Sequence, residues 1–381
     1  MRDLRGKALI IGSGLAILFA FVAAAPQTAW QGTIVKDGDV TVVKNPKEPL
    51  HRTPVLELKE DLSIGGAQAQ GDDVFSQISD VVVDEAGSIY VLDGRSSHVK
   101  VFDASGKYLR TIGRPGQGPG ELEFPMTLSL VRSKGELAVH QMSPRMAFYK
   151  PDGTFLREVF FRGRDVVFGR ADSRGYIYRT EVVADSDGLR LVVRKFGPDG
   201  AALAELSQAP APFATKGPGK VRITTPRELM PDIYFQLDRA DNVVYGYSQA
   251  YDLTIFRGAD AKPFKKITRS YDFVEVSPEE KKEWNKQIPP GSGIEIDFPK
   301  YHPAYDRFFA GDLGHLFVRT WEKTPDGKRI HDIFDAEGRL IGRVPLKGVG
   351  LEVLKGKYYA LEEDEDGYQY VRRYAVNWLV K

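Results

Sequence analysis

The chain has 381 residues and carries 53 basic and 52 acidic side chains. This near balance excludes the strongly basic face on which nucleic-acid-binding proteins depend. The complete absence of cysteine excludes disulfides, thiol catalysis and thiolate metal sites, so packing and backbone hydrogen bonds must hold the fold together.

The first element in chain order is an apolar segment over residues 8–25, which follows a basic start with Arg2, Arg5 and Lys7. Its small residues Ala23 to Ala25 form a site of the kind that signal peptidases cleave. A segment of this length is also near the lower limit for crossing a bilayer, so an uncleaved anchor is the alternative. We assign residues 1–25 to a signal peptide or N-terminal anchor and residues 26–53 to a lead-in segment. A periplasmic or extracellular protein is expected, with a tether to the inner membrane as the alternative.

A turn residue followed by an alternating strand then recurs six times. The segments are GSIYVLD (from Gly87), GELAVHQ (Gly135), GYIYRTE (Gly175), DNVVYGY (Asp241), GHLFVRT (Gly314) and GKYYALE (Gly356). An apolar strand precedes each segment and a second strand follows it. In all repeats but the last, a turn and a further strand come next. Three of the five intervals, 48, 40 and 42 residues, fit a four-stranded propeller blade. The pattern predicts an all-β fold, a six-bladed β-propeller of four-stranded antiparallel blades.

The sixth repeat lacks its fourth strand, because the sequence ends at Lys381 soon after YQYVRRYAV. A spare strand, VLELKEDLSIG, lies before the first complete repeat at Val55 to Gly65. We expect this N-terminal strand to complete the last blade and close the ring, because closure protects strand edges. The propeller domain is therefore placed at residues 54–381.

The glycine-rich stretch RTIGRPGQGPGELEFP, Arg110 to Pro125, lies between the first and second repeats. It matches neither G-x-G-x-x-G nor G-x-x-x-x-G-K-[ST], and no helix is expected after it to bind a phosphate. We interpret it as a crossover between blades.

The first repeat, ISDVVVDEAGSIYVLDGRSSHVKVFDASGKYLRTIGRPGQGPGELEFP, resembles the NHL-like six-bladed β-propeller repeats of exported bacterial proteins. The segments HPAYDRFFAGDLGHLFVRTWE and FDAEGRLIGRVPL are similar to the same group. The resemblance extends from about residue 33 to the C-terminus and implies the fold. It implies no fixed catalytic set.

Two crossovers are longer than a standard blade requires, at residues 207–231 and 272–303. The second should contain a helix, since Ser277, Pro278 and Glu280 form an N-cap, an N1 proline and a capping-box glutamate. Crossovers of adjacent blades open on the same face of a propeller, and long loops in compact domains are often functional. We expect these insertions to form the ligand surface of a binding or interaction module for a protein, peptide or glycan, with no nucleic-acid partner. Candidate binding residues in loops expected on this face are Arg95, His98, Arg114, Arg145, Trp321 and Lys323.

No cofactor or metal site is expected from the sequence. The acidic run EEDEDG, Glu362 to Gly367, resembles the start of a calcium loop, but Arg373 stands where the bidentate glutamate is required. The catalytic residues stay unknown, since no G-x-S-x-G elbow occurs. The alternative function is a propeller hydrolase or lyase, similar to lactonases, with a metal in the central channel.

Overall fold

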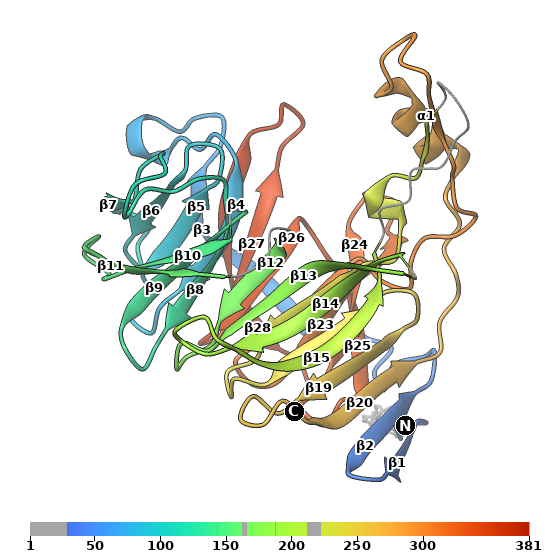
Figure 1. The fold of residues 1–381 in the computed structure, drawn as a ribbon. Helices are drawn as coiled ribbons and strands as arrows, with labels where there is room; N and C mark the ends of the chain where they lie inside the picture. The colour runs from blue at the N-terminus through green and yellow to red at the C-terminus, as the bar shows by residue number, and fades with distance from the viewer. Residues whose placement is uncertain (1–28, 143, 162–165, 187, 212–221, 381) are drawn as a thin grey trace, which may run out of the picture.

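The computed structural model describes residues 29–142, 144–161, 166–186, 188–211 and 222–380. Six four-stranded antiparallel blades stand around a central axis, with each chain segment stepping outward through one blade before it crosses to the next (Figure 1). The predicted six-bladed β-propeller is confirmed. The predicted signal or anchor lies outside the described residues. Among the described helices, none is long and apolar enough to span a bilayer.

Strands are numbered along the chain, and each blade runs from its innermost to its outermost strand. Blade one is β4 (Ile78–Val83), β5 (Ile89–Asp93), β6 (His98–Phe102) and β7 (Tyr108–Ile112). Blade two is β8 (Pro125–Val131), β9 (Glu136–Gln141), β10 (Arg145–Tyr149) and β11 (Phe155–Phe160). Blade three is β12 (Val166–Ala171), β13 (Ile177–Asp185), β14 (Gly188–Phe196) and β15 (Ala202–Pro210).

The second half of the ring follows the same plan. Blade four is β17 (Ile233–Leu237), β18 (Val243–Tyr247), β19 (Asp252–Phe256) and β20 (Pro263–Arg269). Blade five is β22 (Arg307–Ala310), β23 (Leu316–Lys323), β24 (Arg329–Phe334) and β25 (Leu340–Leu346). Blade six is β26 (Val349–Leu354), β27 (Lys357–Glu363), β28 (Gln369–Trp378) and β3 (Leu56–Gly65).

Strand β3 confirms the predicted closure of the ring. It pairs antiparallel with β28 from Leu56 opposite Trp378 to Gly65 opposite Tyr370. Charge complementarity adds to this pairing, since Asp61 lies 2.7 Å from Arg373 and Glu60 lies 2.5 Å from Arg372.

The lead-in segment forms a hairpin that extends blade four. Strands β1 (Thr33–Asp37) and β2 (Val40–Asn45) turn at Gly38, and β2 pairs parallel with β20. The buried Asn45 side chain donates to the carbonyl of Gly338 at 2.9 Å and accepts the N–H of Leu340 at 2.7 Å. The hairpin thereby ties blade four to blade five.

The core lies between the blades. Buried apolar side chains of the described residues form six clusters, and each cluster combines two neighbouring blades, for example Phe148 and Ile177 between blades two and three. Burying both faces of every sheet in this way supplies the stabilisation that disulfides give to smaller exported domains.

The two insertions pair with each other. Strand β16 (Arg222–Thr224) of the first runs parallel to β21 (Ile294–Ile296) of the second, and the hydroxyl of Thr225 donates to the carbonyl of Asp297 at 2.8 Å. Helix α1 (Pro278–Lys286) projects above the ring in Figure 1 and has the predicted capping box. Short 3-10 turns occupy Gly71–Asp73 and Arg227–Leu229. The first insertion begins later than predicted, because residues 207–210 still belong to β15.

Candidate functional site

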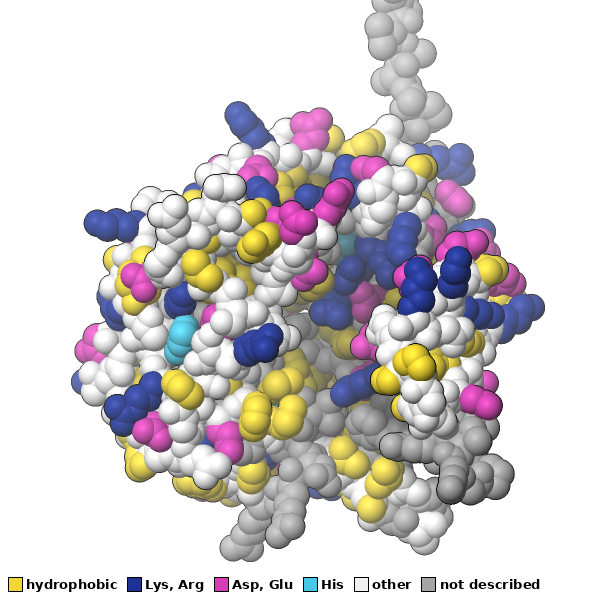
Figure 2. Space-filling view, turned by 90° about the horizontal axis from the view of Figure 1, so that it is seen from above, with side chains coloured by type: hydrophobic (Ala, Val, Ile, Leu, Met, Phe, Trp, Pro, Cys, Tyr) yellow, Lys and Arg dark blue, Asp and Glu magenta, His cyan; other side chains and the backbone are white. Residues whose placement is uncertain are grey.

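A cavity of roughly 460 Å³ follows the axis of the ring and is lined by the innermost strands of all six blades. This volume is within the usual range for small-molecule sites. Basic and acidic side chains gather in and beside the central hollow on the face that carries α1 (Figure 2). The channel is therefore the candidate functional site.

The two ends of the channel are built differently. Every innermost strand starts at the end where the crossovers arrive, and the insertions lead directly into β17 and β22. We call this the upper end. At the lower end, short turns join the first and second strands of each blade, as at residues 84–88 and 238–242.

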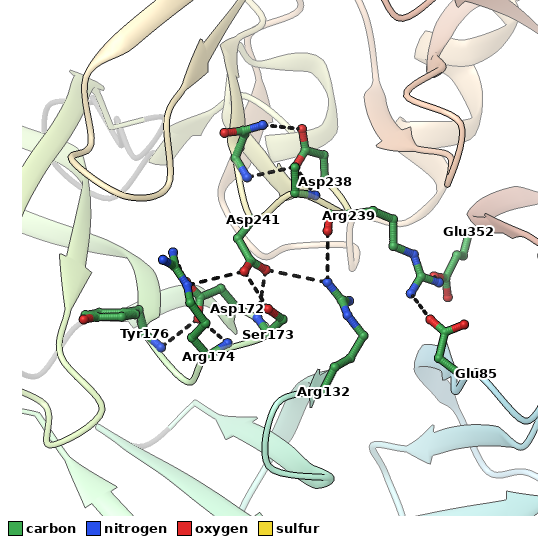
Figure 3. A network of polar contacts seen from close by, with 12 residues as sticks. Glu85, Arg132, Asp172, Ser173, Arg174, Tyr176, Asp238, Arg239, Asp241 and Glu352 are labelled. Atoms are coloured by element: carbon green, nitrogen blue, oxygen red, sulfur yellow. Dashed lines mark hydrogen bonds and ion pairs between the residues drawn. The ribbon is translucent and has the colours of Figure 1, made fainter.

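A guanidinium group crosses the lower end. Arg239 of blade four donates to Glu85 of blade one at 3.0 Å and to Glu352 of blade six at 2.7 Å (Figure 3). Blades one and four stand opposite each other in a ring of six, so this side chain spans the channel. Lys355 also lies 3.0 Å from Glu85.

Asp241 of blade four joins two further blades, two and three, beside this bridge. Its carboxylate accepts the N–H and the hydroxyl of Ser173 at 2.9 and 2.6 Å, and Arg174 and Arg132 lie 3.5 and 3.6 Å away. Arg132 also donates to the carbonyl of Arg239 at 3.3 Å (Figure 3). Side chains from five of the six blades thus obstruct the lower end, and the channel is a pocket that opens upward.

Glu352 is the carboxylate of this network with the most perturbed acidity. Its side chain lines the channel and is 22% exposed, and its partial burial raises its pKa to about 7, while Arg239 acts in the opposite direction. A carboxyl group that titrates near neutrality inside a pocket is a feature of many functional sites, although structural networks produce it too.

We expect Glu352→Gln to alter the pH dependence of stability. Because the pKa of Glu352 is raised in the folded state, its stabilising contribution is full below its unfolded-state pKa and is lost as pH rises through about 7. Glu352→Gln cannot ionise at this position, so its stability does not fall in this way as pH rises. The difference in melting temperature, variant minus wild type, should therefore increase by a few degrees between about pH 5 and pH 8. Thermal denaturation followed by circular dichroism measures this difference.

Glu85→Gln is the matched control with the opposite sign. A hydrogen bond from Lys355 lowers the pKa of Glu85, so its contribution is present above its unfolded-state pKa and is lost as pH falls. This variant should be less stable than the wild type at neutral pH, with the difference shrinking in acid. A Glu352→Gln difference that is independent of pH would contradict the assignment.

The middle of the channel is held by an ion pair between blades one and three. Arg170 on β12 lies 3.1 Å from Asp80 on β4. Both bind the main chain of Leu128 on β8, where Asp80 accepts the N–H at 2.9 Å and Arg170 donates to the carbonyl at 2.8 Å. The pair satisfies backbone groups of the intervening innermost strand.

Polar groups also line the upper end near blades four and five. Arg227 donates to Asp232 through Nε at 3.0 Å and Nη2 at 2.8 Å. Burial raises the pKa of Tyr234, and the carboxylates of Asp306 and Asp232 raise it further, so the phenol stays protonated. The side chain of Arg307 lines the cavity and is 47% exposed.

The six candidate residues from the sequence lie in two separate groups, and none of them is among the described residues that line the channel. Around blades one and two, Arg95 is exposed in the β5–β6 turn and Arg114 pairs with Glu121 at 3.0 Å in the crossover. Burial lowers the pKa of the half-buried His98. Arg145 is buried and holds the crossover in place by donating to the carbonyls of Gly116 and Gln117 at 3.2 and 3.1 Å.

The other two candidates lie on blade five beneath the second insertion. Trp321 stacks on His302 at 4.1 Å between ring centroids, and Lys323 lies 3.7 Å from Glu280 of α1. The structure therefore brings Trp321 and Lys323 together and keeps them apart from the first group.

The glycine-rich stretch is confirmed as a crossover between β7 and β8. Gly113 and Gly120 have φ of 76° and 74°, and a residue with a side chain would be strained in this conformation. The carboxylate of Glu121 accepts the N–H of Gly118 at 2.9 Å, so an acidic group already occupies this loop.

The channel residues were not identified from the sequence. A polar residue within an apolar first strand, such as Asp80 in ISDVVV, is the available signal. The pairing of Arg239 with Glu352 carries no such signal, because the two residues lie 113 positions apart.

A resident metal does not fit the channel as described. Among the residues of the described ranges, no three His, Asp or Glu side chains stand together in a way that could hold a metal ion. The channel carboxylates Asp80, Asp232 and Glu352 are instead each bound by an arginine.

Comparisons with known proteins agree with this architecture. A family model described as a 6-bladed beta-propeller, DUF5128, matches residues 69–195. The chain is similar to that family over a third of its length. Among solved structures, a "Putative exported protein" from Bacteroides fragilis superposes with a TM-score of 0.53 at 12% identity, over 88% of this chain and 99% of that chain. A member of the DUF4221 family from Bacteroides vulgatus superposes with a TM-score of 0.51 at 12% identity, over 85% of this chain and 99% of that chain.

A curated relative matches in part. The Protein brain tumor of Drosophila melanogaster is 27% identical over 135 residues, which is 32% of this chain and 12% of the relative's own length. At these identities the solved structures show the fold alone.

Proposed function

We propose that this chain is an exported, NHL-like propeller that acts as a binding module, with its ligand held at the upper end of the channel. The observation that carries the proposal is the pairing of β16 with β21, since it joins the insertions of adjacent blades into one wall beside the open end. The ligand would be a small polar molecule or the end of a peptide or glycan, or a surface group of a partner protein. Export is supported by the apolar segment at residues 8–25 and by the name of the Bacteroides fragilis neighbour.

Filling the channel should abolish binding. Gln236 lies on β17 two residues after Tyr234, lines the cavity and is half-buried, so the larger side chain of Gln236→Trp would fill the channel directly below the upper end. Gln208→Trp is the matched control, because Gln208 is exposed on the outermost strand of blade three. Ligand-observed NMR with a library of organic acids, amino acids, short peptides and oligosaccharides should give ligands that bind the wild type and the control but not Gln236→Trp. Ligands that bind all three equally would contradict the proposal.

The same ligands distinguish the enzymatic alternative. Incubation of each with the wild-type protein, followed by mass spectrometry, should leave a bound ligand unchanged. Hydrolysis or elimination that Gln236→Trp suppresses would favour the propeller hydrolase or lyase.

A further inference from the structure

Blade five carries two cross-strand pairs of like charge near the upper end. Arg307 on β22 stands opposite Arg319 on β23, and Lys323 on β23 stands opposite Arg329 on β24. Side chains directly opposite each other in antiparallel strands are neighbours on one face, and like charges there are destabilising. We call these four residues the basic corner.

The carboxylates around the basic corner balance only half of its charge. Asp306 lies 2.9 Å from Arg319 and 3.6 Å from Arg307. Glu280 of α1 lies 3.7 Å from Lys323 but also 3.2 Å from His302. Within the part of the chain that the structure describes, four cations thus pair with two carboxylates, which leaves an excess of two positive charges.

Arg329 has no carboxylate partner among the described residues. Its guanidinium lies over the ring of Trp321 at 4.7 Å and donates to the carbonyl of the same residue at 2.8 Å. His302 also stacks on Trp321, so the second insertion packs beside the basic corner. Burial lowers the pKa of Arg329, and Arg319 lowers it further.

Buried donors in and beside the basic corner also lack acceptors. Nε of Arg319 and Nε1 of Trp321 are buried and have no hydrogen-bond partner among the described residues. Leaving such groups unsatisfied destabilises the folded state, and native proteins seldom do so without a bound water, ion or ligand.

The basic corner meets the channel through Arg307. Arg307 lines the cavity, and its side chain and that of Lys323 are each 47% exposed. An anion that enters from the upper end can therefore reach Arg307 without rearranging the blade.

We infer that the basic corner binds an anionic group, a carboxylate, sulfate or phosphate, on the ligand held at the upper end of the channel. This inference rests on the proposed function for the identity of the complete ligand. The anionic group itself can be tested with simple salts, because arginine forms strong charge-assisted hydrogen bonds with any of these oxyanions.

Isothermal titration calorimetry of the full chain tests the inference. The titrants are sodium sulfate, phosphate and acetate, at constant ionic strength set with sodium chloride. Wild-type protein should bind at least one oxyanion saturably, and Arg307→Gln should weaken that binding about tenfold, the loss expected for one charge-assisted hydrogen bond. Arg307→Lys should recover part of it. Arg257→Gln is the matched control, because Arg257 is an exposed arginine paired with Asp260 on the β19–β20 hairpin.

Asp306→Asn should change the affinity for oxyanions in the direction opposite to Arg307→Gln. Asp306 competes with the anion for Arg307 and Arg319, so neutralising it should tighten oxyanion binding several-fold. A purely structural role for the corner would not produce opposite effects in Arg307→Gln and Asp306→Asn. Equal binding by the wild type, Arg307→Gln and Asp306→Asn, or no binding beyond that of chloride, would overturn the inference.

The inference and the proposed function can fail separately. One outcome is that oxyanion affinity changes as expected in Arg307→Gln and Asp306→Asn, while the library ligands bind Gln236→Trp as well as the wild type. This result would support the basic corner and reject the channel as the ligand site. The reverse result would keep the channel and reject the basic corner.

Discussion

A chain that starts at residue 66 is expected to lose most of its stability, because it lacks the strand that closes the ring. Val55, Leu56 and Ile64 are buried between blades five, six and one. Each contributes about 1.5–3 kcal/mol, so their joint loss approaches the total stability of about 5–15 kcal/mol for a typical domain. Urea denaturation followed by tryptophan fluorescence should show a chain that is unfolded or retains only a broad, weak transition.

The control is a chain that starts at residue 54, which keeps β3 and removes the β1–β2 hairpin. It should fold cooperatively with a smaller loss, since the hairpin extends the outer edge of blade four and contacts blade five but does not close the ring. If the two truncated chains have the same denaturation midpoint, the closing role of β3 is wrong.

Asp332→Ala should destabilise the propeller nearly as strongly. Asp332 on β24 is fully buried and lies 2.8 Å from Arg269 of blade four and 2.8 Å from Arg343. It also accepts the hydroxyl of Tyr251 at 2.5 Å. Removing the carboxylate leaves the buried guanidinium of Arg269 without its partner, which costs about 3–5 kcal/mol.

Differential scanning calorimetry should show a fall in melting temperature on the order of 10 °C for this variant. Glu322→Gln is the matched control, because Glu322 binds the same Arg343 at 2.5 Å but is 42% exposed, and surface ion pairs contribute about 0–1 kcal/mol. Equal effects of the two substitutions would show that burial of the Asp332 network adds nothing.

The blades were predictable because their signals are local. A turn glycine followed by period-two alternation recurs in sequence, and glycines such as Gly106 and Gly338 have the positive φ that the turns require. The closing strand was predictable because the sixth repeat lacks a fourth strand and the strand at residues 55–65 belongs to no other repeat. The lead-in hairpin was missed, because β1 is exposed along its whole length and has no buried alternation to reveal it.

The site was harder to predict because its contacts join distant residues. The insertions were located from their length and their common face was inferred from topology, but the pairing of β16 with β21 depends on short segments without strong strand character. The channel depends on which polar residue of each first strand faces the axis. The basic corner depends on the register between β22, β23 and β24, including a bulge after Arg319 that sets Lys323 opposite Arg329.

The Arg239 bridge also limits how a long molecule could engage this protein. Because the side chain reaches from blade four to blades one and six, a polymer could not be threaded through the ring and could offer only its terminus. A polymer that binds in this pocket is therefore recognised by its end and not by an internal segment. It must leave through the same upper end by which it enters.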